Sequence, residues 1–267
     1  MLQNVLSVAL LLSSASASCL HGTSLMPRRL NGRATVEVAT YGYDGANGPL
    51  NWHNLAPANS MCATGKNQSP INLGSSIKKA AKAPVIEIPN VQSAEFENLG
   101  STLEVIVNGT TTVDGRAFEL AQFHLHTPSE HRINDEYYPL EMHMVHQAAD
   151  GDGFTVLGLM FELSEDGSTT ELLTSMNEVL ADVTTPGSIT QTGALDFKPI
   201  VKHLTSTPLL SYSGSLTTPP CSEGINFLIS QTPMAIDVKT FNALKGVMKF
   251  NSRVSQNVPG QDNLLGL

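Results

Sequence analysis

The stretch FHLHTPSEH, residues 123–131, places three histidines, a glutamate and a proline within nine positions. His124 and His126 are two residues apart, and side chains at i and i+2 of a β-strand point to the same face. The residues before them, AFELAQ at 117–122, predict that the stretch begins inside a strand. Two histidines on one strand face suit a metal ion, but the pair alone also fits a polar strand edge that runs into a turn.

A second predicted strand, PLEMHMVHQ at 139–147, follows the turn sequence INDEYYP. Glu141 and His143 alternate along it and share one face. An antiparallel pairing of the two strands would bring His143 against His124 and His126. Three imidazoles without a fourth protein ligand are typical of a catalytic zinc site with one open position, whereas structural zinc sites are closed and usually contain cysteines.

Each predicted strand also offers an acceptor for a histidine ring. Gln122 lies two residues before His124, and Glu141 lies two before His143, so each pair shares a face. An acceptor for the second ring N–H of a ligating histidine fixes its tautomer and raises its basicity. We expect these roles for Gln122 and Glu141; the alternative for Glu141 is an ordinary solvent-facing strand residue.

The composition excludes several classes of protein. Of the 267 residues, 41% are hydrophobic and 15% charged, as in a soluble globular protein. The net charge of −9 argues against a nucleic-acid partner. No segment reaches the roughly 18 consecutive apolar residues that a membrane-spanning helix needs. We find no repeat and no linker between residues 40 and 256, so we expect one domain.

The hydrophobic periodicity predicts a mostly β protein with short peripheral helices, in the α+β class. Strands are predicted by short apolar or alternating segments at 102–108, 117–126, 139–147, 154–163 and 224–230. Helices are predicted by apolar positions at helical spacing at 169–183 and 237–249, the second of which begins at a capping Asp237.

The N-terminus has the features of a secretory signal. Residues 5–12, VLSVALLL, form an apolar run, and Ala15 and Ala17 follow in A-x-A spacing. We therefore expect a signal peptide at 1–17, an irregular mature N-terminus at 18–39 and the catalytic domain at 40–267. The protein would be secreted and extracellular, or periplasmic if bacterial. An N-terminal core helix is the alternative, which the serines after the apolar run disfavour.

Secretion affects how the cysteines and two asparagines are interpreted. An oxidising compartment favours a disulfide between Cys62 and Cys221, with two free buried thiols as the alternative. NGT at Asn108 is a glycosylation sequon. NQS at Asn67 is a weaker one because Pro70 follows it directly.

Four motifs, QFHLHTPSEH, EMHMVH, GSLTTPP and QSPINL, together resemble the α-class carbonic anhydrases in order and approximate spacing. The resemblance extends from Tyr41 to Gln256. It implies a single domain around a large twisted, mainly antiparallel central sheet, with zinc at the base of a conical cavity. It also implies reversible hydration of CO2 to bicarbonate and a proton by attack of a zinc-bound hydroxide.

The resemblance assigns roles to individual residues. His124, His126 and His143 would bind zinc, and Gln122, Glu141 and the backbone at Asn251 would hold these ligands. Thr217 would orient the nucleophile while its own hydroxyl donates a hydrogen bond to Glu130. The wall of the pocket that holds CO2 would comprise Val145, Val156, Leu216, Thr218, Ile225 and Phe227.

The sequence departs from the family at the position of the proton shuttle. Ser101 stands where the fast enzymes carry a histidine, and His53 is a candidate replacement. A carbonic anhydrase-like binding or matrix protein without catalysis is the alternative function, although such proteins typically lose a zinc histidine, and all three are present here. A zinc esterase or hydrolase would need a separate general acid, for which we find no candidate.

Overall fold

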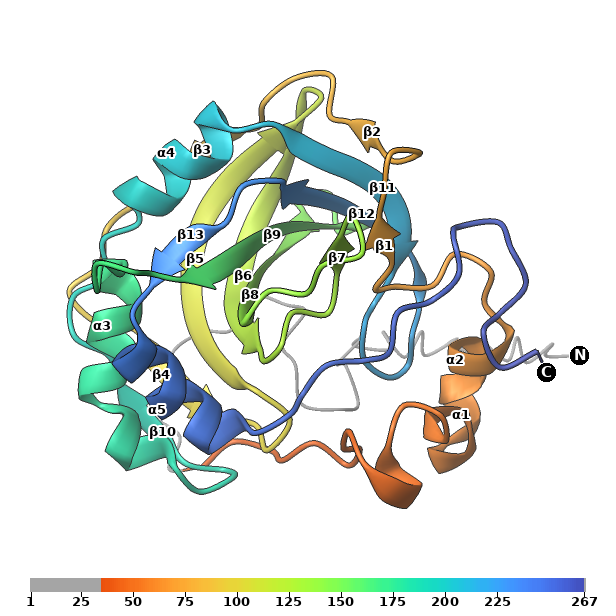
Figure 1. Cartoon of the computed structure of the whole chain (residues 1–267), viewed down its shortest axis with the longest axis horizontal. Coiled ribbons are helices and arrows are strands. Elements are labelled where there is room, and N and C mark those ends of the chain that lie inside the picture. Colours follow the sequence, from red (N-terminus) through yellow and green to blue (C-terminus); the bar gives the residue numbers. More distant parts are fainter. Residues whose placement is uncertain (1–34, 267) are drawn as a thin grey trace, which may run out of the picture.

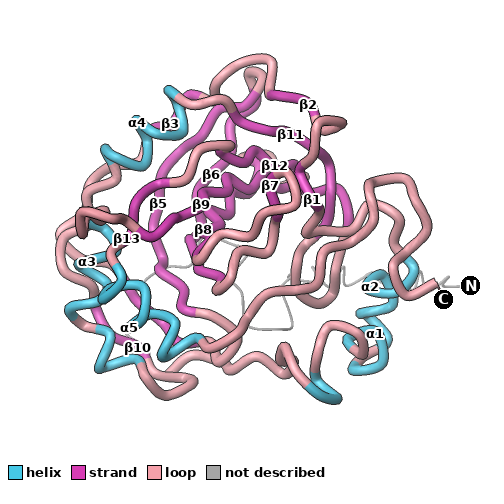
Figure 2. The backbone as a smooth tube through the Cα atoms, in the orientation of Figure 1, coloured by secondary structure: helices cyan, strands magenta, loops and turns pink. Residues whose placement is uncertain are grey.

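The computed structural model describes residues 35–266 of the chain. The predicted signal peptide and most of the predicted irregular N-terminus lie outside these residues. Strands occupy the centre of the described structure, and helices lie at its periphery (Figures 1 and 2). Among the helices of the described chain, none is long and apolar enough to cross a membrane.

One 11-stranded sheet runs in the order β10-β4-β5-β6-β8-β9-β12-β11-β2, with β3 added to β5 and β13 to β9. Most neighbours are antiparallel, whereas β12 and β13 pair with β9 in parallel. The strands are β2 (Lys78–Lys79), β3 (Val85–Glu87), β4 (Glu95–Asn98), β5 (Leu103–Val113), β6 (Arg116–His126), β8 (Leu140–Ala148), β9 (Phe154–Leu163), β10 (Ile189–Gln191), β11 (Leu209–Ser215), β12 (Glu223–Ser230) and β13 (Met234–Ile236). A separate two-stranded pair joins β1 (Asn72–Leu73) to β7 (Arg132–Ile133). The predicted fold class is confirmed.

Alternation along β6 assigns its side chains to two different environments. Phe123 and Leu125 belong to the larger apolar core, together with Met142 and Met144 of β8. Three helices complete this core: α3 (Glu171–Glu178), α4 (Lys198–Ser206) and α5 (Val238–Met248), which lie on one side of the sheet (Figure 1). The opposite face carries a second apolar cluster and the predicted histidines.

The helix predictions were right in place and partly wrong in length. Residue Asp237 caps α5 as predicted, since its carboxylate accepts the backbone N–H of Thr240 at 2.9 Å. The predicted helix at 169–183 is interrupted: α3 ends at Glu178, and a 3₁₀ helix follows at Leu180–Val183. Helix α4 was not predicted, because its core-facing positions, Ile200 and Leu204, are too few to give a clear helical period.

The N-terminal part of the domain packs against the end of the chain. It contains 3₁₀ helices at Gly45–Asn47 and Pro57–Ser60 and the short helices α1 (Trp52–Leu55) and α2 (Met61–Thr64). A disulfide joins Cys62 of α2 to Cys221, 159 residues later, so the disulfide prediction is confirmed. Two further bonds attach the C-terminal segment here: the backbone N–H of Gly260 to the carbonyl of Lys66, and the Asn263 side chain to that of Gly65.

Candidate metal centre

The three predicted histidines meet on one face of the sheet. Strands β6 and β8 are antiparallel, with His124 directly opposite His143. The third, His126, lies two residues after His124, and its ring centroid is 5.0 Å from that of His124 and 4.7 Å from that of His143. One ring nitrogen from each histidine lies within 4.8 Å of the other two. All three side chains are buried.

Hydrogen bonds assign a tautomer to each ring. Nδ1 of His124 donates to the Gln122 side-chain oxygen at 2.9 Å. Nδ1 of His126 donates to the backbone carbonyl of Asn251 at 2.8 Å. Nε2 of His143 donates to the Glu141 carboxylate at 2.7 Å. Each ring therefore retains one nitrogen with a lone pair: Nε2 of His124 and His126, and Nδ1 of His143.

The donor set fits a metal ion. Nε2 of His126 is buried and has no hydrogen-bond partner within residues 35–266, and a buried polar atom of this kind is costly unless a ligand binds it. Burial lowers the pKa of His124 well below its ordinary value, and the nearby His126 and His143 lower it further. Burial is also the main cause that lowers the pKa of His126. Neutral imidazoles are the form that binds metal.

Glu141 connects this cluster to a second buried network. Its Oε1 accepts from His143 and also from Nδ1 of His131 at 2.7 Å, while Nε2 of His131 lies 2.6 Å from the Tyr212 hydroxyl. Its Oε2 accepts the backbone N–H groups of Glu130 and His131. Burial raises the pKa of Glu141, but the two histidines outweigh burial and hold it well below its ordinary value. Sequence reasoning did not place His131 in the site, because it follows β6 in a turn and shares no strand face with the ligands.

The Glu130 carboxylate is buried beside the histidines. Its Oε1 accepts the backbone N–H of Arg253 at 2.9 Å. Its Oε2 has no hydrogen-bond partner among the described residues and lies 3.4 Å from Nε2 of His126 and 3.9 Å from Nδ1 of His143. Within residues 35–266 no hydrogen bond joins Glu130 to Thr217, so the bond between them stays a prediction.

The predicted apolar wall gathers next to the histidines. Register places Val145 of β8 opposite Val156 of β9, and Val156 opposite Phe227 of β12. These three side chains belong with Ile225 to the second apolar cluster, against which Leu216 packs. The ring centroid of Phe227 also lies 6.1 Å from the ring centroid of His143. Thr218 is half-buried on the segment after Leu216 and accepts the backbone N–H of Cys221 through its carbonyl.

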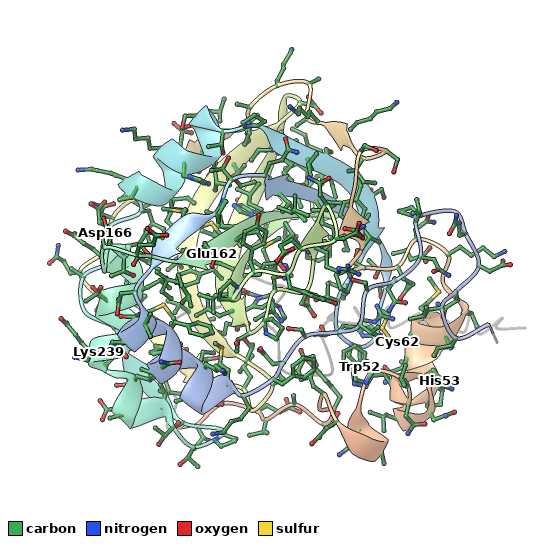
Figure 3. All side chains as sticks on the ribbon, viewed as in Figure 1. Trp52, His53, Cys62, Glu162, Asp166 and Lys239 are labelled. Atoms are coloured by element: carbon green, nitrogen blue, oxygen red, sulfur yellow. A yellow bond between two sulfur atoms is a disulfide. The ribbon has the colours of Figure 1, made fainter. Side chains whose placement is uncertain are left out.

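Ser101, at the position of the family's proton shuttle, and His53, the candidate replacement, lie in different parts of the structure. Ser101 is 3% exposed, its hydroxyl has no hydrogen-bond partner among the described residues, and its carbonyl accepts from the Asn251 side chain. Figure 3 places His53 on α1 at the outer edge of the molecule, near Cys62. Sequence reasoning had left the position of His53 open.

A buried set of three histidine nitrogens with an acidic residue and an apolar wall beside it is typical of a metalloenzyme site for a small substrate. The family model of the eukaryotic-type carbonic anhydrases matches residues 47–264. The chain therefore belongs to the eukaryotic-type carbonic anhydrase family, the α class, and is an enzyme of that family. This membership supports CO2 hydration as its reaction.

Individual relatives agree with the family model. A carbonic anhydrase of Pectobacterium atrosepticum is 35% identical over 226 residues, which cover 83% of this chain and 88% of that protein. The structure of a fungal α-carbonic anhydrase from Aspergillus oryzae is similar with a TM-score of 0.82 and 40% identity, covering 84% of this chain and 96% of that one. The α-carbonic anhydrase of Thermovibrio ammonificans, solved with the inhibitor sulfanilamide, gives a TM-score of 0.73 and 36% identity, covering 84% and 97%.

Proposed function

We propose that the protein catalyses reversible hydration of carbon dioxide to bicarbonate and a proton, with one zinc ion held by His124, His126 and His143. The observation that carries this proposal is the set of tautomers. In each ring, one nitrogen donates a hydrogen bond to a fixed acceptor. The other ring nitrogens of the three histidines lie close to one another and can bind the same ion. Three imidazole nitrogen ligands with room for a fourth group suit zinc in a catalytic site.

Zinc bound here would supply a nucleophile at neutral pH, because in carbonic anhydrases it lowers the pKa of its water to about 7, a value known for this family. The protein's own contribution is orientation. Gln122, Glu141 and the Asn251 carbonyl hold the three rings. The polar groups on the sheet and the apolar wall face one space, so a small apolar substrate can lie against Val145 and Phe227 next to the nucleophile.

We assign Thr217 and Glu130 to the direction of the nucleophile. Within the part of the chain that the structure describes, Oε2 of Glu130 has no hydrogen-bond partner, whereas Oε1 accepts from the backbone N–H of Arg253. A Thr217 hydroxyl that donates a hydrogen bond to Oε2 keeps only lone pairs for the reacting group, so it can accept a hydrogen bond from that group and fix its direction. Leu216, Thr218 and Ile225 complete the proposed substrate wall with Val156.

A non-catalytic binding or matrix protein is the second candidate function. The same fold without a functional metal site would not need fixed hydrogen-bond acceptors for the ring N–H groups of the three histidines. The structure has an acceptor behind each one, which favours catalysis.

We also propose that the mature protein is extracellular and glycosylated at Asn108. That side chain is exposed at a bulge between β5 and β6. Asn67, by contrast, is half-buried, and its amide group donates to Glu223 at 3.3 Å. Mass mapping of secreted protein from a eukaryotic host should find a glycan at residue 108 and none at residue 67.

A stopped-flow assay of CO2 hydration tests the proposed reaction. Purified protein with one zinc per chain should accelerate hydration, lose the rate after treatment with pyridine-2,6-dicarboxylate, and recover it when zinc is added back. A folded, zinc-loaded protein with no rate above that of the buffer would support the non-catalytic alternative.

A further inference from the structure

Arg253 is a buried arginine on the segment that follows α5, and it is 2% exposed. Burial lowers the pKa of its guanidinium to about 10, so the group stays protonated at neutral pH and acts only as a donor. It donates to the backbone carbonyl of Ser69 at 2.7 Å, the side-chain oxygen of Gln68 at 3.0 Å and the carbonyl of Cys62 at 3.3 Å. Its carbon Cζ lies 5.6 Å from the centroid of the Trp52 ring, which is close to Cys62 in Figure 3. The guanidinium therefore binds several separate groups at once.

The backbone of the same residue holds Glu130. The N–H of Arg253 donates to Oε1 of Glu130 at 2.9 Å. The other oxygen, Oε2, lies 3.4 Å from Nε2 of His126 and has no hydrogen-bond partner within residues 35–266. A carboxylate is planar, so a fixed Oε1 also restricts the direction in which Oε2 can accept a hydrogen bond.

Two groups that the guanidinium holds also fix the segment that carries Thr217. The N–H of Ser69 donates to the Ser215 hydroxyl oxygen at 2.9 Å, and the N–H of Ser215 donates to the Ser69 hydroxyl oxygen at 3.0 Å. The Gln68 amide donates to the backbone carbonyl of Cys221 at 3.0 Å. Because Thr217 lies between Ser215 and Cys221 in the chain, its segment is held on both sides.

We infer that Arg253 is a positioning residue that aligns Thr217 with Glu130. This inference rests on the proposed function, in which the Thr217 hydroxyl donates a hydrogen bond to Oε2 of Glu130. The two residues belong to segments far apart in the sequence, and Arg253 connects to one through its backbone and to the other through its side chain. A hydrogen bond weakens steeply as its angle departs from linear, so a small shift of either segment would weaken the one between them.

The choice of ligand separates alignment from a merely structural role. A Thr217 hydroxyl that donates to Glu130 can only accept a hydrogen bond from a ligand at the metal. Bicarbonate has an O–H group that can donate to it, whereas thiocyanate has no hydrogen. Loss of alignment should therefore weaken the binding of bicarbonate and leave that of thiocyanate unaltered. An arginine that only stabilised the fold would affect both ligands alike.

The test is titration of Co²⁺-substituted protein with each anion by visible absorption at one pH. The variants are Arg253→Lys, Gln68→Ala and the control Arg116→Lys, which changes an exposed arginine that pairs with Asp150. A lysine cannot replace the planar donor fork of arginine. We expect the Kd of bicarbonate to rise about 3- to 10-fold in Arg253→Lys and about 2- to 5-fold in Gln68→Ala. It should change less than about 1.5-fold in Arg116→Lys.

A double-mutant cycle adds a second readout. In a Thr217→Val background the acceptor for bicarbonate is absent, so Arg253→Lys should change the Kd of bicarbonate by less than about 1.5-fold. In zinc-loaded protein, kcat/KM for CO2 should fall about 10- to 100-fold in Arg253→Lys, because the nucleophile is less well directed. A merely structural role would give the same loss of bicarbonate affinity in both backgrounds.

An unchanged bicarbonate affinity in folded Arg253→Lys would overturn the inference, as would an equal loss for thiocyanate or an undiminished loss in the Thr217→Val background. If circular dichroism shows that Arg253→Lys does not fold, Gln68→Ala decides by the same comparisons, and an unchanged bicarbonate affinity there overturns the inference. The cobalt titrations need no turnover. A protein that shows the predicted series of affinities but hydrates no CO2 would refute the proposed reaction alone.

Discussion

The backbone carbonyl of Asn251 accepts the hydrogen bond from Nδ1 of His126 at 2.8 Å, although 125 residues separate them. The Asn251 side chain makes the connection rigid. Its oxygen accepts the backbone N–H of Thr127 at 2.7 Å, and its amide donates to the carbonyls of Ser101 and Leu125. One residue near the C-terminal end thus holds the end of β6, a metal ligand and the Ser101 segment together.

Asn251→Ala should loosen the metal site and destabilise the fold. The variant leaves the buried N–H of Thr127 and the Ser101 carbonyl without this partner, whereas the Leu125 carbonyl keeps its bond from Thr102. The loss costs about 2–4 kcal/mol in free energy of unfolding. Zinc affinity should fall about 10- to 100-fold, because the carbonyl that orients His126 is no longer fixed. Urea denaturation and competition with a chelator measure the two effects. Asn257→Ala, which removes only an exposed hydrogen bond, is the control; equal zinc affinity in the two variants would contradict this role.

Glu141→Gln should weaken zinc binding while preserving shape. The amide has one oxygen in place of two, so it cannot accept from His143, His131 and two backbone N–H groups at once. We expect zinc affinity about 10- to 100-fold lower, measured by competition with a chelator. The matched change Glu119→Gln on the exposed part of β6 should leave zinc affinity unaltered. Wild-type affinity in Glu141→Gln would show that the carboxylate does not hold the ligand.

Reduction of the Cys62–Cys221 disulfide should lower stability without removing the zinc site. The bridge closes a loop of 159 residues, and its loss should cost about 2–5 kcal/mol in free energy of unfolding. Denaturation of the wild type with and without reductant measures the effect. The double variant Cys62→Ala/Cys221→Ala should be about as stable as the wild type with its disulfide reduced, and reductant should not change the stability of the variant. An identical stability of oxidised and reduced wild type would be the contrary result.

Proton release should limit turnover because Ser101 cannot carry a proton near neutral pH, whereas a histidine titrates there. Without a shuttle, release from a donor of pKa about 7 is limited to roughly 10³–10⁴ s⁻¹ by diffusion-limited recombination. We expect kcat to rise with imidazole buffer while kcat/KM stays constant. Ser101→His should raise kcat in weak buffer and flatten that dependence, with thermal unfolding as a check on packing.

The control for this prediction is His53→Ala. Because His53 lies at the outer edge on α1 (Figure 3), its removal should leave the buffer dependence as it is in the wild type. A wild-type kcat far above 10⁴ s⁻¹ in weak buffer, with no response to imidazole, would show that another group carries the proton.

Short-range periodicity accounts for what could be predicted of the site from sequence. The i, i+2 spacing places His124 and His126 on one face, and a single antiparallel pairing adds His143. These inferences need only two neighbouring strands. The same reasoning identified five strands of the central sheet, β5, β6, β8, β9 and β12, because each is an apolar or alternating segment between turns. It did not identify β2, β3, β4, β10, β11 and β13.

Relations that depend on strand order or on distant segments could not be derived from spacing. The position of Glu104 on β5, directly opposite His124 on β6, requires β5 and β6 to be neighbours, and a periodic pattern does not specify neighbours. The contact of His131 with Tyr212 joins residues 81 positions apart. The carbonyl of Asn251 carries no side-chain signal at all, and only the family resemblance pointed to it.

Zinc content tests the central claim most directly. Wild-type protein and His143→Ala, purified in parallel and dialysed against the same metal-free buffer, should be compared by metal analysis, with circular dichroism to show that both are folded. The account predicts close to one zinc per wild-type chain and loss of most of it in His143→Ala. A folded His143→Ala that retains a full equivalent of zinc, or a wild type that cannot be loaded with zinc, would contradict it.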